Sequence, residues 1–317
     1  DWYPIQGKNR ILSMIENRPD WVVSRQRAWG VPLSIFYHKI SGEPLIDTEL
    51  NEKIIKMYEE HGCDVWFEKT KAELLGDKYN PDEYEKVDDI LDVWFDSGCT
   101  HAFVLDGKED QIWPASIYLE GTDQHRGWFH SSLLESCGTR GVAPYEAVLT
   151  HGFVLHEDGN KMSKSSSNIV PPAEIIEKSG ADILRLWVAS SDYSDDLKIG
   201  PEIIKSNADS YRRLRNSLRF ILGNLNDFKE EEKISFSDLS ELDKYILGRL
   251  TELEEEVLKN YQIFEYQKVF SAIFNFCTNE LSSFYFDITK DNLYCDHKSS
   301  HTREPQELFL IFFLIIY

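Results

Sequence analysis

The chain has 317 residues, which favours two domains, and its 42% apolar and 28% charged residues are typical of globular proteins. A net charge of −21 argues against non-specific nucleic-acid binding, although a local basic cluster can still bind phosphate. No apolar run of about 18 residues occurs, so the pattern predicts no membrane-spanning helix. The five cysteines are widely spaced without a Cys-x-x-Cys pair, which favours reduced thiols in a cytosol and argues against a zinc site.

The first third of the chain alternates short elements with polar loops. We expect an amphipathic helix within residues 1–15 and a strand-and-turn stretch over 17–32, where Pro and Gly interrupt any helix. That stretch contains Arg25 and Arg27, for which pairing with nearby carboxylates is favoured over contact with a nucleic acid. Residues 90–98 predict a buried strand that ends in a turn.

A candidate ligand site follows the apolar run 116–119. Glu120 and Gly121 come where that strand should end, and Asp123 and Gln124 where a helix should start. Open α/β sheets bind ligands at such strand ends. A carboxylate there can accept hydrogen bonds from ribose hydroxyls or an ammonium group, and glycine lets a ligand approach the backbone. The alternatives are a solvated strand end for Glu120 and a helix N-cap for Asp123.

Residues 158–168 have the composition of an exposed, mobile loop, with one Met among Gly, Asn, Lys and Ser. A buried strand over 147–155 should precede the loop, and a helical pattern follows it. Lys161 and Lys164 stand three residues apart in the loop, and two ammonium groups on a mobile segment suit a polyphosphate ligand. On composition alone, a solvated charged loop is the alternative.

From Pro201 onward the pattern changes to long amphipathic helices. Apolar residues recur at helical spacing in three segments, 211–225, 239–257 and 266–284, and predict an antiparallel bundle. A charged linker is expected over 227–237. Basic residues repeat on one face of the first helix at Arg212, Arg215 and Arg219, where phosphate contact and pairing with Asp or Glu are equally good interpretations.

Three motifs resemble the class I aminoacyl-tRNA synthetases, and within them the bacterial isoleucyl type. The motifs are KMSKS at 161–165, YLEGTDQHRGWF at 118–129 and GADILRLWVAS at 180–190. The resemblance implies an α/β fold, with the C-terminal half of a Rossmann-type nucleotide-binding catalytic domain followed by an α-helical bundle that starts the anticodon-binding domain. It divides the chain into a return from an editing insertion (1–32), a catalytic part with a stem-contact region (33–200), a helical part (201–300) and an aberrant apolar tail (301–317).

The resemblance also implies a reaction and its partners. Isoleucine would react with ATP, assisted by Mg²⁺, to give isoleucyl-adenylate and then isoleucyl-tRNA(Ile), in a cytoplasmic monomer without contact to a membrane and without zinc in this chain. Lys164 would bind the ATP phosphates with help from Lys161. The adenylate would contact Glu120, Gly121, Asp123, Gln124, Trp94 and Trp128, and the tRNA would contact Arg212, Arg215 and Arg219. For Trp94 and Trp128, size alone supports only core packing.

One departure from the family pattern is plain. The second signature motif, His-x-Gly-His, does not occur among the nine histidines. We therefore expect an internal fragment that lacks the first half of the nucleotide fold and the editing insertion and is inactive alone. A valyl- or leucyl-type synthetase and a non-catalytic tRNA-binding module are the alternatives, and dependence on ATP separates the module from an enzyme.

Overall fold

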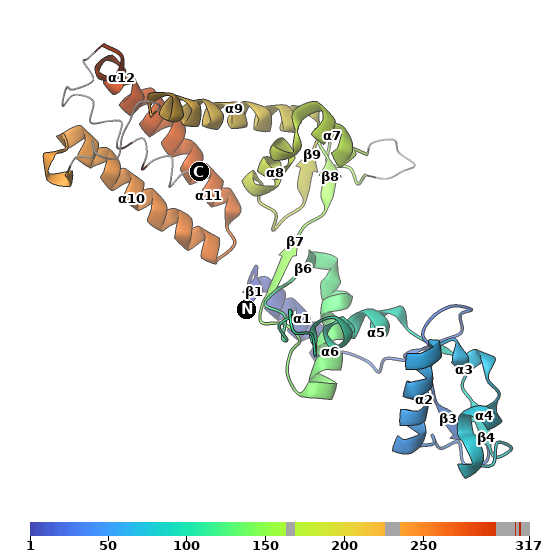
Figure 1. Ribbon diagram of the computed structural model, residues 1–317. Coiled ribbons are helices and arrows are strands. Elements are labelled where there is room, and N and C mark those ends of the chain that lie inside the picture. Colours follow the sequence, from blue (N-terminus) through green and yellow to red (C-terminus); the bar gives the residue numbers. More distant parts are fainter. Residues whose placement is uncertain (163–168, 226–234, 296–307, 309–310, 312–317) are drawn as a thin grey trace. The chain divides into compact units, whose positions relative to one another are not determined.

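The computed structural model describes residues 1–162, 169–225 and 235–295, together with Leu308 and Ile311 (Figure 1). The chain divides into two units, Asp1–Thr150 and His151–Tyr317. Each unit has its own hydrophobic cores. Among the described residues, no helix is long and apolar enough to cross a membrane.

The first unit contains a three-stranded sheet in the order β1-β7-β6, with β1 at Trp2–Tyr3, β6 at Tyr118–Gly121 and β7 at Val148–His151. β1 pairs with β7 in parallel. The helix expected within 1–15 is confirmed as α1 (Gln6–Glu16). α1 and α6 (Trp128–Arg140) share with the sheet a core of buried side chains, namely Ile11, Tyr118, Phe129, Tyr145 and Val148.

A small lobe of the first unit is built on an antiparallel pair, β3 (Phe36–His38) and β4 (Tyr84–Lys86). Three helices accompany the pair: α2 (Thr48–His61), α3 (Val65–Glu68) and α4 (Lys71–Leu75), the last followed by the 3₁₀ turn η1 (Gly76–Lys78). Asp47 caps α2 by accepting hydrogen bonds from the backbone N–H groups of Glu49 and Leu50. The lobe has its own core around Phe36, Trp66 and Leu74.

A short antiparallel pair, β2 (Ser24–Arg25) with β5 (Ile90–Leu91), precedes the helix α5 (Val93–Gly98). The strand predicted over 90–98 is therefore wrong beyond Leu91. The reason is local: the Asp92 side chain accepts a hydrogen bond from the Trp94 backbone N–H at 3.0 Å and so starts a helix. A π-helical turn, η2 (His101–Leu105), follows α5.

The second unit begins with β8 (Val154–His156), which pairs in parallel with β9 (Leu197–Ile199). Two helices follow β8 in the chain, α7 (Pro172–Ser179) and α8 (Ala181–Ser190), and their apolar residues share a core with β9 and α9. The single strand predicted over 147–155 is wrong, because β7 and β8 belong to different sheets. They are separated at Gly152, whose N–H donates to the Tyr193 carbonyl at 2.9 Å.

The predicted helical bundle is confirmed in the rest of the second unit (Figure 1). It comprises α9 (Pro201–Asn224), the 3₁₀ turn η6 (Phe236–Asp238), α10 (Glu241–Gln262), α11 (Tyr266–Asn275), the π-helical η7 (Phe276–Tyr285) and α12 (Phe286–Cys295). Ile221, Ile246, Leu250, Leu281 and Leu308 are among the buried residues of its core. Most of the linker predicted over 227–237 lies outside the described residues.

Candidate functional site

The turn after β6 has the strand–turn–helix geometry that the sequence predicts. β6 ends at Gly121, the 3₁₀ turn η3 covers Thr122–Arg126, and α6 begins at Trp128. Glu120 is exposed at the end of the strand, whereas Gly121 is buried. The turn therefore presents an exposed carboxylate at the carboxyl end of a strand, which is where open α/β sheets bind ligands.

Gln124 closes this turn onto the start of α6. Its Oε1 accepts a hydrogen bond from the Trp128 backbone N–H at 2.9 Å, and its Nε2 donates to Asp123 Oδ2 at 3.0 Å. A Cβ at Gly127 would lie 2.5 Å from Gln124 Oε1 and 3.0 Å from the Trp94 ring. Glycine at position 127 thus lets the amide and the indole approach one point of the backbone.

The two tryptophans predicted for the site lie on neighbouring helices and differ in packing. Trp94, on α5, is 44% exposed. Trp128 stacks face to face on Tyr118, with ring centroids 4.1 Å apart, and its Nε1 donates to the Ser97 carbonyl at 2.9 Å. The structure therefore brings Trp94, Trp128, Gln124 and Asp123 together around Gly127, with Glu120 at the start of the same turn.

A buried carboxyl group that the sequence did not single out lies between α5 and α6. Both side-chain oxygens of Glu135 are enclosed, and a Cβ at Gly98 would lie 2.4 Å from Oε1. Burial, with a smaller effect of the Asp96 charge, raises the Glu135 pKa to about 7, while the neighbouring Cys99 thiol acts to lower it. Burial and Glu135 in turn raise the pKa of the Cys99 thiol to about 12.

The described part of the candidate phosphate loop is its first half, in the second unit. A tight turn bends the chain there, with the His156 N–H donating to the Asn160 carbonyl at 3.0 Å. The Nζ of Lys161 lies 5.9 Å from the centre of the Phe153 ring. Lys164, the other predicted phosphate ligand, lies outside the described residues.

The basic face predicted on α9 is exposed at all three arginines, Arg212, Arg215 and Arg219. Arg212 forms an ion pair with Asp209 one turn earlier, so pairing within the helix occurs at this position. Arg212 also lines a cavity of about 400 Å³ beside α7, together with Lys178 and Lys205.

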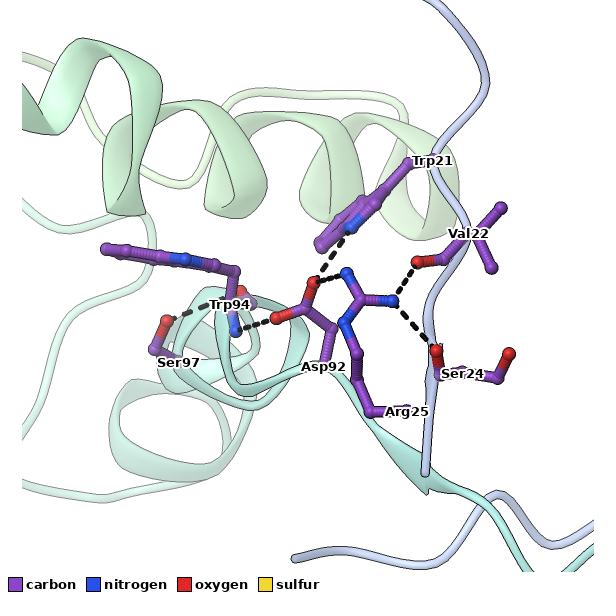
Figure 2. A network of polar contacts seen from close by, with 7 residues as sticks. All are labelled: Trp21, Val22, Ser24, Arg25, Asp92, Trp94 and Ser97. Carbon is purple, nitrogen blue, oxygen red and sulfur yellow. Dashed lines mark hydrogen bonds and ion pairs between the residues drawn. The ribbon is translucent and has the colours of Figure 1, made fainter. Parts of the chain in front are cut away.

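The pairing predicted for Arg25 is confirmed: its guanidinium forms an ion pair with Asp92, the residue that caps α5 (Figure 2). Arg27, by contrast, is exposed. Among the described residues, no group of three or more His, Cys, Asp and Glu side chains is placed to hold a metal ion.

Comparison with known protein families gives two matches along the chain. A family model described as tRNA synthetases class I (I, L, M and V) matches residues 1–200. The chain belongs to this class I tRNA synthetase family. A second model, the anticodon-binding domain of tRNA ligase, matches residues 243–316, in agreement with the helical bundle of this synthetase.

Curated relatives of this class I synthetase chain carry the name isoleucine–tRNA ligase. Those of Pelagibacter ubique and Zymomonas mobilis subsp. mobilis are each 54% identical to it, over 98% and 93% of the chain. The predicted resemblance to the isoleucyl type is thereby confirmed. The chain spans 34% and 31% of these two relatives, about a third of their length.

Solved structures confirm the fold of this synthetase chain. A ternary complex of Agrobacterium radiobacter K84 LeuRS with tRNA and LeuAMS has a TM-score of 0.67 at 18% identity, covering 96% of this chain and 42% of that one. Mycobacterium tuberculosis methionyl-tRNA synthetase in complex with methionyl-adenylate has a TM-score of 0.66 at 18% identity, covering 99% and 54%. The predicted α/β catalytic fold followed by a helical anticodon-binding domain is correct.

Proposed function

We propose that this chain takes part in the ATP-dependent activation of isoleucine to isoleucyl-adenylate and in transfer of the isoleucyl group to tRNA(Ile). The observation that carries the proposal is the 52–54% identity to isoleucine–tRNA ligases over 93–98% of the chain. The geometry of the turn after β6 supports it, because the exposed Glu120 precedes a turn in which an amide and two indoles lie around Gly127.

In the proposed first step, a carboxylate oxygen of isoleucine attacks the α-phosphorus of ATP, and the bond to the bridging oxygen of pyrophosphate breaks. This step transfers no proton, so catalysis consists of positioning and of stabilising charge on the departing pyrophosphate. We assign the phosphates to Lys164, with Lys161 assisting, because ammonium groups form charge-assisted hydrogen bonds with phosphate oxygens. Mg²⁺ would arrive with the ATP substrate.

We assign the adenylate to the turn after β6. Glu120 would accept hydrogen bonds from a ribose hydroxyl or from the ammonium group of isoleucine, and Gly121 would let the ligand approach the backbone. The apolar side chain of isoleucine would lie against Trp94 and Trp128, whose rings flank the same turn. Asp123 and Gln124 complete the assigned contacts.

We assign tRNA phosphates to Arg212, Arg215 and Arg219, which are exposed on one long helix of a strongly acidic chain. We propose a domain division with 33–200 catalytic, 201–300 in the anticodon-binding domain, 1–32 returning from an editing insertion and 301–317 as the tail. The class I synthetase match over 1–200 supports the catalytic part, and the anticodon-binding match over 243–316 supports the helical part. We further propose a monomer in the cytoplasm, which sedimentation of the purified protein and cell fractionation would test.

A chimera tests the proposal directly. The chain replaces the matching segment of the Pelagibacter ubique isoleucine–tRNA ligase, and isoleucine-dependent exchange of pyrophosphate into ATP is measured. We expect exchange with isoleucine and at least about tenfold less with valine or leucine at equal concentration. The 317-residue chain alone should show no exchange. A chimera that folds but exchanges only with valine or leucine would identify a different substrate.

The non-catalytic alternative is a module that binds tRNA without ATP. Filter binding of tRNA(Ile) by the chain, together with the exchange assay on the chimera, separates the two. Binding of tRNA by the chain, combined with a folded chimera inactive towards all three amino acids, would favour the module.

A further inference from the structure

One buried carboxylate links the start of α5, beside this site, to a strand far away in the sequence: Asp92, which is only 6% exposed. Its two oxygens have different partners (Figure 2). Oδ1 accepts a hydrogen bond from the Trp94 backbone N–H at 3.0 Å. Oδ2 accepts one from Trp21 Nε1 at 3.2 Å and forms the ion pair with Arg25.

Arg25 is itself held in place. Its Nη1 donates to the Val22 carbonyl at 2.5 Å and to the Ser24 carbonyl at 2.8 Å. The backbone adds a second connection, because β2 pairs with β5 and the Asp92 N–H donates to the Val23 carbonyl at 2.7 Å. The guanidinium is thus fixed by the strand on which it stands and directed at the cap of α5.

The helix that Asp92 starts bears one tryptophan of the proposed amino-acid pocket and accepts a hydrogen bond from the other. α5 has only six residues, too few for a helix to be stable without outside contacts. It bears Trp94, and its Ser97 carbonyl accepts the hydrogen bond from Trp128 Nε1. A displacement at the N-terminus of α5 would therefore move one tryptophan directly and release the other from its acceptor.

We propose that Arg25 and Asp92 are positioning residues that hold α5 in place and so set both tryptophans of the amino-acid pocket. The assignment of that pocket rests on the proposed function, whereas the link from the ion pair to the Trp128 hydrogen bond does not. Removing one partner leaves the other charge without its counterpart in a half-buried site, which favours rearrangement of the cap.

The structural part is tested on the 317-residue chain by hydrogen exchange of the indole N–H groups, observed by NMR, with the Trp128 signal assigned through Trp128→Phe. We expect Arg25→Gln and Asp92→Asn to accelerate exchange of the Trp128 indole proton by about tenfold. The matched control is Asp47→Asn, because Asp47 also caps a helix, α2, and pairs with a basic residue, Lys78. That control should leave Trp128 unchanged.

If circular dichroism shows that either variant does not fold, exchange of the Trp128 indole proton is measured in Arg25→Lys instead. This variant keeps the charge but loses the forked geometry of the guanidinium. An unchanged Trp128 exchange rate in every folded variant would overturn the proposal, and so would equal acceleration by Asp47→Asn.

The functional part is tested in the chimera. We expect Arg25→Gln and Asp92→Asn each to raise the KM for isoleucine about tenfold with the KM for ATP changed less than about twofold, and the double variant to match the singles. A loss of stability alone would lower kcat without this split, and that result would overturn the positioning role. A wild-type chimera without isoleucine-dependent exchange would refute the proposed function instead, while the indole exchange would still decide the structural link.

Discussion

Replacing Glu135 by Gln should make the first unit more stable at high pH. The carboxyl group is enclosed between α5 and α6, and burial is the main cause that raises its pKa to about 7 from 4.5. Because the pKa is raised in the folded state, the folded chain keeps a proton that the unfolded chain releases. The contribution of the Glu135 carboxyl group to the free energy of unfolding is therefore fully present below about pH 4.5. It is lost as the pH rises through about 7.

The size of the effect follows from the same shift. For a fully enclosed carboxyl group, the shift from 4.5 to about 7 corresponds to about 3 kcal/mol. Glu135 is only half-buried as a whole residue, so solvent screening reduces this to about 1–2 kcal/mol. At pH 8 the Glu135→Gln variant should thus have a free energy of unfolding higher than wild type by about 1–2 kcal/mol, and near pH 4.5 the gain should vanish.

Tryptophan fluorescence during urea denaturation measures the free energy of unfolding of the first unit, because every tryptophan except Trp187 lies in that unit. Subtracting the free energy of unfolding of wild type from that of the variant at each pH cancels the contributions of the other acidic groups. Glu146→Gln, at an exposed position, is the control and should follow wild type. A difference between Glu135→Gln and wild type that stays constant from pH 4.5 to 8 would refute the idea that Glu135 carries a raised pKa.

Three further predictions concern the proposed site and are measured in the chimera. Lys164→Ala should lower kcat for pyrophosphate exchange by about a hundredfold with isoleucine binding unchanged; an effect confined to the KM for isoleucine would contradict the phosphate role. Glu120→Gln should weaken binding of an isoleucyl-adenylate analogue by about tenfold or more in calorimetric titration, and equal affinities would remove Glu120 from the site. Gly127→Ala should raise the KM for isoleucine about tenfold, since its Cβ would meet Gln124 and Trp94; an unchanged KM would show that both side chains can move aside.

Elements with a strong local pattern could be predicted from the sequence. The apolar stripes after Pro201 repeat at helical spacing over many turns, and the bundle formed there. The turn after Leu119 was also predictable, because an apolar strand followed by glycine and then polar residues has few other solutions. The sequence predicted that Arg25 pairs with a carboxylate, but it did not identify the partner, Asp92, which lies far away in the chain.

The elements that were predicted wrongly are short, and their structure depends on residues distant in the sequence. Residues 90–98 are rich in β-branched and aromatic side chains, which favour a strand, yet a single hydrogen bond from the Trp94 backbone N–H to Asp92 begins a helix instead. The raised pKa of Glu135 had no sequence signal either, because it arises from enclosure between two helices. The sequence signal for the helix start is Asp92 itself, because aspartate is among the residues preferred at helix N-caps.

The contacts that hold α5 in place are harder to recognise in the sequence than the tryptophans of the proposed amino-acid pocket. Ser97 holds Trp128 through its backbone carbonyl, so the identity of residue 97 carries little information about this contact. At the other end of α5, the helix cap needs a side-chain acceptor and the ion pair needs two opposite charges. Of these contacts, only those made by Asp92 and Arg25 therefore depend on the identity of the residue. Substitutions at position 97 should therefore be tolerated as long as α5 forms, whereas positions 25 and 92 should accept few replacements.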